Sequence, residues 1–325
     1  MSVVSWVLHN HIKKINQENA LFTPGPASLT FENLISLGPV FGRGDSKYNK
    51  LEIEVLDWLR DISGQPEIVR LQGSATLAIE IALENFVSGK VLLLQTGYYS
   101  NRIVEMLHHR SDIKISTIEP SEAIPAGEFY DWVIACPTET STGYLTPISL
   151  LRDLATKVQA RLFLDATASI GLEENHGLAN VVCFSSCKGL FGLTGAAFIA
   201  FNVSVERVPT HFSLDIETYR GKKTTGPYHA MQSLSHMVKS HHKVRKSVFI
   251  NKQRMVESNK LILLHPIENQ PKLCTAVKSQ VRSLDPKVTL YESRIPNSFR
   301  IICHLGEAHL AENATGDILQ KLEFY

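Results

Sequence analysis

The chain has 325 residues, of which 44% are hydrophobic and 20% charged, a composition typical of a soluble globular protein with one large or two moderate domains. Its 33 basic and 32 acidic residues give a formal net charge of +1, which argues against a nucleic-acid-binding protein. Its five scattered cysteines and short apolar runs argue against a disulfide framework and a membrane span, so we expect a cytoplasmic protein without membrane or nucleic-acid partners.

The first half of the chain has a regular alternation of patterns. Residues 1–20 have a partly helical spacing of apolar side chains and are expected to form an N-terminal arm or short helix. Helical spacing then falls at 50–62, 74–87, 100–110 and 147–159, and strand-like runs fall at 90–96, 112–119, 131–136, 160–167, 180–186 and 195–201. This alternation predicts an α/β domain with a mostly parallel sheet.

After about residue 205 the pattern changes. A long basic helix-like stretch covers 226–264, strand-like runs cover 287–293 and 298–305, and a final helix-like stretch covers 314–324. This order is typical of a smaller α+β unit. We therefore predict an N-terminal arm at 1–20, a large domain at 21–234 and a small C-terminal domain at 235–325.

Several predicted strands are followed by residues that can bind a ligand. In open parallel sheets, ligands bind at the carboxyl ends of the strands. The sequence Gly-Ser-Ala-Thr at 73–76 opens a predicted helix, where backbone N–H groups and hydroxyls can bind an anion. An ordinary helix cap is the other interpretation of this stretch.

Three further residues at strand ends suit a flat, charged cofactor. Tyr99 can stack on a ring, or it can be a half-buried core aromatic. Asp165 can hold a protonated ring nitrogen, or it can be an ordinary strand–helix turn residue. Lys188 can form a Schiff base, or it can extend from a loop into water. Together, their order along the chain predicts a site for pyridoxal phosphate, with the phosphate at 73–76.

These motifs resemble those of class V aminotransferases, which belong to the fold-type I group of pyridoxal phosphate enzymes. The resemblance runs from about residue 21 to the C-terminus. It is carried by "LFTPGPASLT", "LQGSATLAIE", "TGYYSNRI", "PTETSTGYLTPI", "LFLDATASIG", "SSCKGLFG", "KKTTGPYHA" and "SFRIICHLGE". It implies a large domain with a mostly parallel sheet, a smaller α+β domain and pyridoxal 5'-phosphate as cofactor.

The resemblance also implies roles for individual residues. Lys188 and Asp165 are expected to be catalytic, with Lys188 moving the proton and Asp165 keeping the ring nitrogen protonated. Thr225 is expected to reach the cofactor of a partner subunit, which implies a homodimer with its active site at the interface. The expected cofactor-binding residues are Ser74, Ala75, Thr76, Tyr99, Thr142, Asp165, Ser185, Lys188 and Thr225.

Within the class, the stretch "FGRGDSKYNKLEIEVLDWL" is similar to aminotransferases that act on 2-aminoethylphosphonate and pyruvate. That similarity implies the products phosphonoacetaldehyde and L-alanine. Arg300, in the "FRI" motif, is expected to bind the substrate carboxylate, and it can also take the phosphonate. Arg43 is a second phosphonate-binding candidate.

Other functions remain open at this point. Alanine–glyoxylate and serine–pyruvate aminotransferases share most of the motifs, and a cysteine desulfurase would need a nucleophilic cysteine. A non-catalytic protein with the same fold is a third alternative. The chain departs from the family at Ala75, where a glycine is usual, at Cys187, and in a short interval of 112 residues between Lys188 and Arg300. Its paired histidines are interpreted as solvated helix faces, so no metal is expected.

Overall fold

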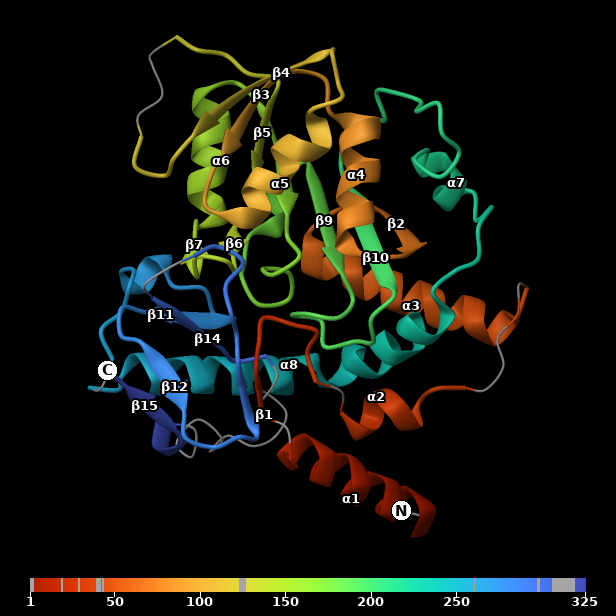
Figure 1. The fold of residues 1–325 in the computed structure, drawn as a ribbon. Helices are drawn as coiled ribbons and strands as arrows, with labels where there is room; N and C mark the ends of the chain where they lie inside the picture. Colours follow the sequence, from red (N-terminus) through yellow and green to blue (C-terminus); the bar gives the residue numbers. More distant parts are fainter. Residues whose placement is uncertain are drawn as a thin grey trace.

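A seven-stranded sheet forms the centre of the computed structural model, which describes residues 3–18, 20–28, 30–38, 42, 44–122, 127–259, 261–296, 299–305 and 319–325 (Figure 1). The strand order is β2-β10-β9-β8-β5-β3-β4, and neighbours are parallel except where β10 pairs with β2 and β9. The strands are β2 (Glu67–Gln72), β3 (Gly89–Leu94), β4 (Ile113–Ile118), β5 (Trp132–Ala135), β8 (Arg161–Asp165), β9 (Val181–Ser185) and β10 (Ala196–Phe201). The predicted α/β fold with a mostly parallel sheet is confirmed.

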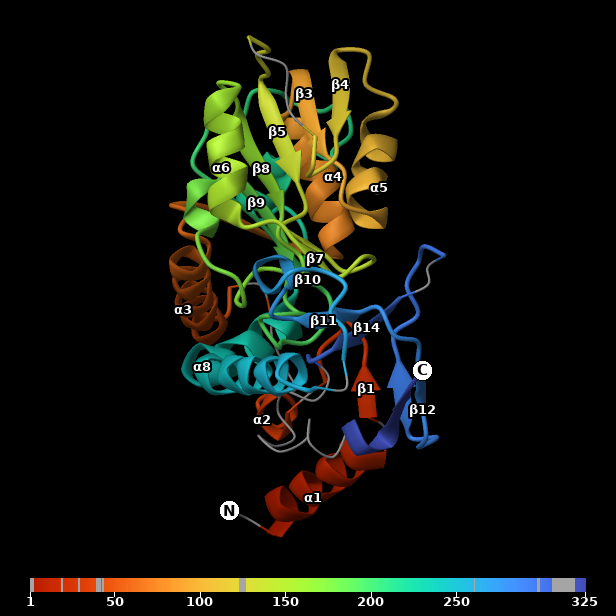
Figure 2. The same ribbon diagram turned by 90° about the vertical axis from the view of Figure 1, so that its left-hand side faces the viewer.

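Helices cover both faces of this sheet (Figure 2). One face packs against α4 (Ala75–Phe86), α5 (Tyr98–Leu107) and the short α7 (Ile216–Arg220). The other face packs against α3 (Ser46–Ser63), α6 (Ile148–Lys157) and the first part of α8 (Tyr228–Val256).

Strand β5 illustrates why the strand sequences are apolar throughout. Trp132 and Ile134 belong to the core on the α4 side, whereas Val133 and Ala135 belong to the core on the α6 side. All four side chains are buried. Because both faces are covered, the strands need apolar residues at consecutive positions, and a polar residue at a strand end stands out.

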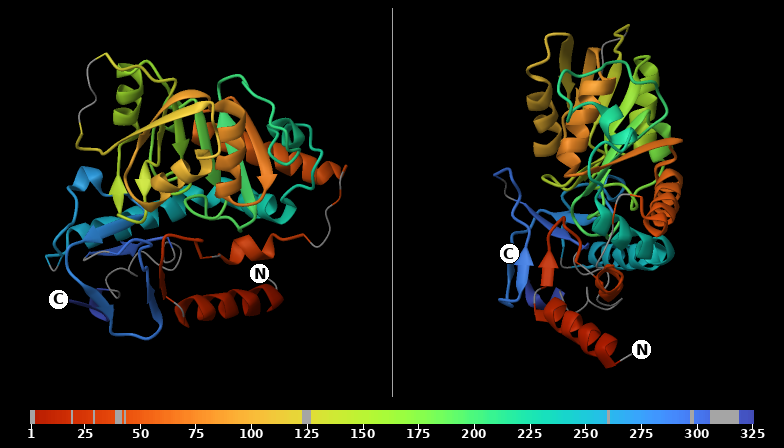
Figure 3. Two further views of the ribbon diagram at one scale, coloured as in Figure 1. Left: turned by 45° about the horizontal axis from the view of Figure 1, so that its top comes forward. Right: turned by 90° about the vertical axis from the view of Figure 1, so that its right-hand side faces the viewer.

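Helix α8 runs beneath the large sheet to a group of small two-stranded sheets (Figures 1 and 3). Its middle part packs on β11 and β14, where Met237 and Val248 meet Cys274 and Cys303. Helices α1 (Val3–Glu18) and α2 (Phe31–Ile35) lie on the side away from the large sheet. The small pairs are β1 (Ala20–Phe22) with β13 (Val288–Leu290), β11 (Cys274–Val277) with β14 (Arg300–Cys303), β12 (Val281–Ser283) with β15 (Leu322–Phe324), and β6 (Thr138–Glu139) with β7 (Tyr144–Leu145).

Two features refine the expectations for the C-terminal half. The predicted helix at 314–324 is wrong at its end, because Leu322–Phe324 forms β15 and pairs antiparallel with β12. Only 319–321 is helical among the described residues of that stretch. Helix α8 continues unbroken across residue 234, so the division at 234/235 remains a prediction. None of the described helices has the length and apolar character needed to cross a membrane.

Candidate active site

A cavity of about 450 Å³ opens at the carboxyl ends of the central strands. In parallel sheets, ligands are expected at these carboxyl ends. Its lining comes from the turns after β2, β3, β5, β8 and β9, together with the loop before β14. Seven of the nine predicted cofactor-binding residues line it: Ser74, Ala75, Thr76, Tyr99, Asp165, Ser185 and Lys188.

The turn before α4 presents a helix N-terminus to the cavity. Ser74 has an extended backbone (φ −95°, ψ 162°), and its hydroxyl accepts a hydrogen bond from the N–H of Leu77 at 3.3 Å. A Cβ at Gly73 would lie 2.9 Å from Leu77 Cδ2, so the Leu77 side chain packs closely against this glycine. Ala75, which differs from the family pattern, still permits this tight turn. The positive end of the helix and the Ser74 and Thr76 hydroxyls can bind an anion such as a phosphate.

Asp165 ends β8 and is almost fully buried, with 2% of its surface exposed. Its Oδ1 accepts hydrogen bonds from the Thr167 backbone N–H at 3.1 Å and from the Thr167 hydroxyl. Within the described residues the carboxylate has no ion-pair partner. Oδ2 takes part in neither of these bonds and can therefore accept one from a ligand. A buried carboxylate without a cation is costly, so this position suits a ligand that carries a positive ring nitrogen.

Lys188 follows β9 and is half-buried. Its Nζ lies 5.6 Å from the centroid of the Tyr99 ring. Gly25 lies against its aliphatic stem, and a Cβ there would be 2.9 Å from Lys188 Cγ. The N–H of Ala27 donates to the carbonyl of Cys187 at 2.7 Å. The N-terminal segment therefore covers the aliphatic stem of the lysine.

A buried carboxylate fixes the helix that carries Tyr99. Glu139 Oε2 accepts hydrogen bonds from the backbone N–H groups of Tyr99 and Ser100, at 3.0 and 3.1 Å. Its Oε1 accepts from the Ser141 hydroxyl at 2.6 Å. Burial raises the pKa of the Glu139 carboxyl. Sequence analysis assigned no role to this residue, although the whole stretch stood out as a motif. It links the start of α5 to the β6–β7 turn and thereby orients Tyr99.

Three of the predicted residues are not part of the described lining of this cavity. The hydroxyl of Thr142 donates to the Thr96 carbonyl at 2.9 Å, and Thr142 lines a separate hollow beside His265. Thr225 is exposed in the loop before α8. Arg300 begins β14 opposite Val277, and it is not among the described residues that line the cavity. Arg43 lies outside the described residues.

Two charged residues of the cavity, Arg102 and Arg294, were not predicted from the sequence. Arg102 lies one helical turn after Tyr99, and its guanidinium is 5.1 Å from the Tyr99 ring centroid. The spacing of three residues was a usable signal, because such residues share a helix face. Arg294 comes from the loop between β13 and β14, and only the folded chain brings it to Tyr98 and Tyr99, at 5.2 and 5.9 Å.

Sequence comparison finds curated relatives of the chain, and no family model matches it. The chain is 30% identical over 198 residues to a protein of Pseudomonas aeruginosa named 2-aminoethylphosphonate–pyruvate transaminase, covering 55% of this chain and 53% of that protein. A Rhizobium meliloti protein of the same name is 28% identical over 170 residues, covering 47% and 44%. The chain thus spans about half the length of the curated relatives it matches. The resemblance predicted from the motifs is confirmed.

Solved structures with the same fold match nearly the whole chain. Pyridoxamine-pyruvate aminotransferase from Mesorhizobium loti has a TM-score of 0.77 and 18% identity, covering 93% of this chain and 92% of that one. Ureidoglycine-glyoxylate aminotransferase from Bacillus subtilis has a TM-score of 0.74 and 18% identity, covering 93% of each chain. The chain therefore has the fold of these aminotransferases, the predicted fold-type I architecture.

Proposed function

We propose that the protein is a pyridoxal phosphate-dependent aminotransferase that converts 2-aminoethylphosphonate and pyruvate into phosphonoacetaldehyde and L-alanine. One observation carries the proposal: a single cavity gathers an anion-binding helix N-terminus, a buried carboxylate and a covered lysine around one aromatic ring. The names of the curated relatives support the choice of substrates.

The residues present fit pyridoxal phosphate. Ser74 and Thr76, with the N-terminus of α4, would hold the phosphate. Asp165 would hold the ring nitrogen, and Tyr99 would contact the ring. Once bound, the cofactor supplies an electron sink that makes the substrate proton removable. Ser185 lines the same cavity and can donate a hydrogen bond to the cofactor.

The protein's own groups do the remaining work. Lys188 Nζ would act as the base that removes the proton from the substrate carbon next to the amine, and it would then deliver a proton to the cofactor carbon that takes up the amino group. Asp165 would face the cationic ring nitrogen of the cofactor, and that pairing would offset the cost of its burial. The segment around Gly25 covers the Lys188 stem and excludes water from that side of the amine. Glu139 holds the start of α5 so that Tyr99 keeps its place.

The proposal includes three further statements. The protein works in the cytoplasm as a homodimer, and Thr225, exposed on one protomer, would reach the partner's cofactor phosphate. Arg300 and Arg43 remain candidates for substrate binding. The large domain at 21–234 and the small domain at 235–325 would share α8 as their connection.

An alanine–glyoxylate aminotransferase is the second candidate. The Nostoc sp. protein of that name has the same fold, with a TM-score of 0.74 and 18% identity. Cys136 and Cys187 both line the cavity, and Cys187 is half-buried. Burial raises the pKa of the Cys136 thiol well above its ordinary value, which argues against Cys136 as the nucleophile of a cysteine desulfurase. Cys303 is also fully buried, within β14.

A product assay separates these functions. Purified protein is loaded with pyridoxal phosphate and given 2-aminoethylphosphonate with pyruvate, and L-alanine is measured. The proposal expects alanine in this reaction and much less product when alanine or serine is offered with glyoxylate. A preference for alanine with glyoxylate would select the second candidate. No product with any pair, despite bound cofactor, would contradict an aminotransferase function.

A further inference from the structure

Two arginines of the cavity differ from the buried arginines elsewhere in the chain. Arg70 and Arg110 each pair with a carboxylate, at 2.6 and 2.7 Å. In the part of the chain that the structure describes, Arg102 and Arg294 make no ion pair with an Asp or Glu. The Nε of Arg102 is buried and has no hydrogen-bond partner there. Guanidinium groups without a carboxylate in a cavity are free to bind an anionic ligand.

The described lining of the cavity carries more positive than negative charge. Its described lining contains three cationic side chains, Arg102, Lys188 and Arg294, but only one carboxylate, Asp165. All three cations lie near the same ring, at 5.1, 5.6 and 5.9 Å from the Tyr99 centroid. Under the proposed function, the phosphate of the cofactor lies at the N-terminus of α4 and Lys188 is occupied by the cofactor. Positive charge is then left over for the acidic group of the substrate.

Arg294 is the better placed of the two arginines for a ligand that must enter and leave. It is exposed, whereas Arg102 is half-buried within α5. Arg294 lies in the loop before β14, and contacts with Tyr98 and Tyr99 hold its guanidinium at the cavity. A planar guanidinium can donate two parallel hydrogen bonds to a phosphonate or a carboxylate. Arg300, six residues later, does not belong to the described lining.

We propose that Arg294 is a substrate-binding residue whose guanidinium binds the oxyanion of the substrate, the phosphonate of the amino donor and the carboxylate of the keto acid. This proposal rests on the proposed function for the identity of the substrates. The guanidinium pairs with each acid in turn, because the two substrates occupy the cavity in successive half-reactions. Tyr98 and Tyr99 position the guanidinium through their rings and through side-chain hydrogen bonds.

Binding of unreactive anions tests the proposal separately from turnover. The dissociation constants of methylphosphonate and acetate are measured by isothermal titration calorimetry on the cofactor-loaded wild type, Arg294→Gln and Arg294→Lys. Arg282→Gln is the matched control, because Arg282 is also exposed but pairs with Glu323 on the β12–β15 sheet. Steady-state KM and kcat for both substrates are measured on the same proteins.

The proposal expects Arg294→Gln to weaken the binding of at least one anion about tenfold or more and to raise the corresponding KM, with kcat changed much less. Arg294→Lys should recover part of the affinity, since lysine keeps the positive charge but cannot donate two parallel hydrogen bonds from a planar group. Visible absorption of the bound cofactor should be the same in all variants. Unchanged affinities and KM values in Arg294→Gln would overturn the proposal. If the wild type instead shows no bound cofactor or no turnover, the proposed function fails, which is a different result.

Discussion

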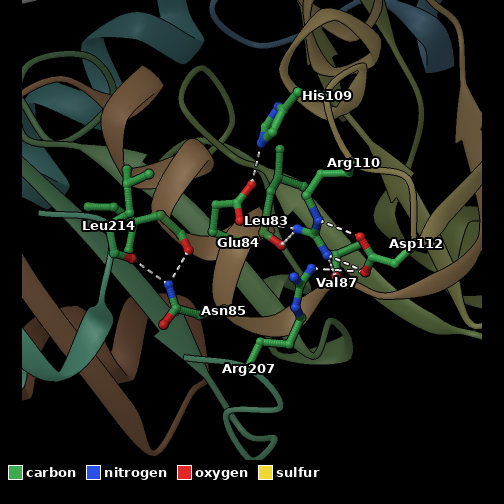
Figure 4. A network of polar contacts seen from close by, with 10 residues as sticks. Leu83, Glu84, Asn85, Val87, His109, Arg110, Asp112, Arg207 and Leu214 are labelled. Carbon is green, nitrogen blue, oxygen red and sulfur yellow. Dashed lines mark hydrogen bonds and ion pairs between the residues drawn. The ribbon is translucent and has the colours of Figure 1, made fainter. Parts of the chain in front are cut away.

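Two arginine-containing regions lie at opposite ends of the strands of the central sheet. At the amino ends of β3 and β4, Arg110 is buried and donates to both carboxylate oxygens of Asp112, at 2.8 and 2.7 Å (Figure 4). It also donates to the carbonyls of Leu83 and Val87, at 3.3 and 2.8 Å. Arg207 completes the group with a 2.9 Å bond to Asp112. This network satisfies its charges internally and holds α4, α5 and β4 together.

The cavity at the carboxyl ends has the opposite character. Its cations, Arg102, Lys188 and Arg294, face one buried carboxylate and make no ion pair among the described residues. A fully partnered cluster stabilises the fold, whereas unpaired charges in a cavity are kept for a ligand. The structural arginines are therefore those that pair with carboxylates of the chain, and the functional cations are those in the cavity that do not. Substitutions in the cavity at the carboxyl ends should change activity, whereas substitutions in the network at the amino ends should change the free energy of unfolding.

The largest effect is expected at Lys188. Lys188→Ala should lower alanine formation by about 10³-fold or more, because the base and the attachment point of the cofactor are lost together. Its thermal unfolding midpoint without cofactor should stay within a few degrees of wild type, because the side chain makes no ion pair among the described residues. Loss of activity together with a large loss of stability would instead mark Lys188 as a structural residue.

Arg110→Ala should lower the stability of the protein and leave its activity unchanged. Removing the buried Arg110 side chain takes a donor from the carbonyls of Leu83 and Val87 and an ion-pair partner from the mostly buried Glu84, which should cost about 2–4 kcal/mol in urea unfolding, whereas the exposed Asp112 keeps its bond from Arg207. KM and kcat at a temperature where the variant is folded should match wild type. A changed KM with unchanged stability would contradict a purely structural role for the Arg110 network.

His176 should contribute a pH dependence that has nothing to do with the cavity. Burial lowers its pKa from 6.5 to about 4, and its Nε2 lies 2.9 Å from the Ser169 hydroxyl. Between these pH values the unfolded chain binds a proton that the folded chain does not, so stability should fall as pH drops from about 6.5 to about 4. The expected loss from this one group is about 3 kcal/mol.

His176→Gln is the matching variant for that measurement. Its unfolding free energy should fall less steeply over the same pH range, because glutamine does not titrate. Other buried histidines, among them His304, also have lowered pKa values and will contribute to the wild-type slope. Equal slopes for wild type and variant would show that His176 is not buried as described.

Gly25→Ala should have the smallest effect of the four. Gly25 has φ +138°, and an added Cβ would lie 2.9 Å from Lys188 Cγ. We expect a cost of about 1–3 kcal/mol from the backbone, and weaker cofactor binding because the lysine stem must shift. Gly127→Ala is a useful control, since its φ is +83° and no atom lies within 4 Å of its added Cβ. Equal cofactor affinity in both variants would mean that residue 25 does not position Lys188.

The sequence predicted those features that depend on local pattern and on the geometry of parallel sheets. Continuous apolar runs such as 131–136 identify strands covered on both faces. Asp165 ends β8 and Lys188 follows the neighbouring strand β9, so both had to lie at the carboxyl ends of these parallel strands. Tyr99 was found for the same reason, because it follows β3.

Features that depend on tertiary packing were not predicted. Arg294 reaches the cavity because its loop leads from β13 into β14, where Tyr291 forms a bridge with Ile301, and no local pattern indicates this approach. The same limit applies to Leu322–Phe324, whose helix-like spacing is overridden by pairing with β12. Glu139 was part of a recognised motif, but its bonds to α5 require the fold.

The central claim, that this cavity binds pyridoxal phosphate through Lys188, is tested most directly by borohydride reduction followed by peptide mass spectrometry. Reduction fixes a lysine-bound cofactor as a stable amine. Our account predicts one modified peptide that carries the cofactor on Lys188, and no modification of this peptide in Lys188→Ala. A modification on a lysine outside the cavity, or none after incubation with the cofactor, would contradict it.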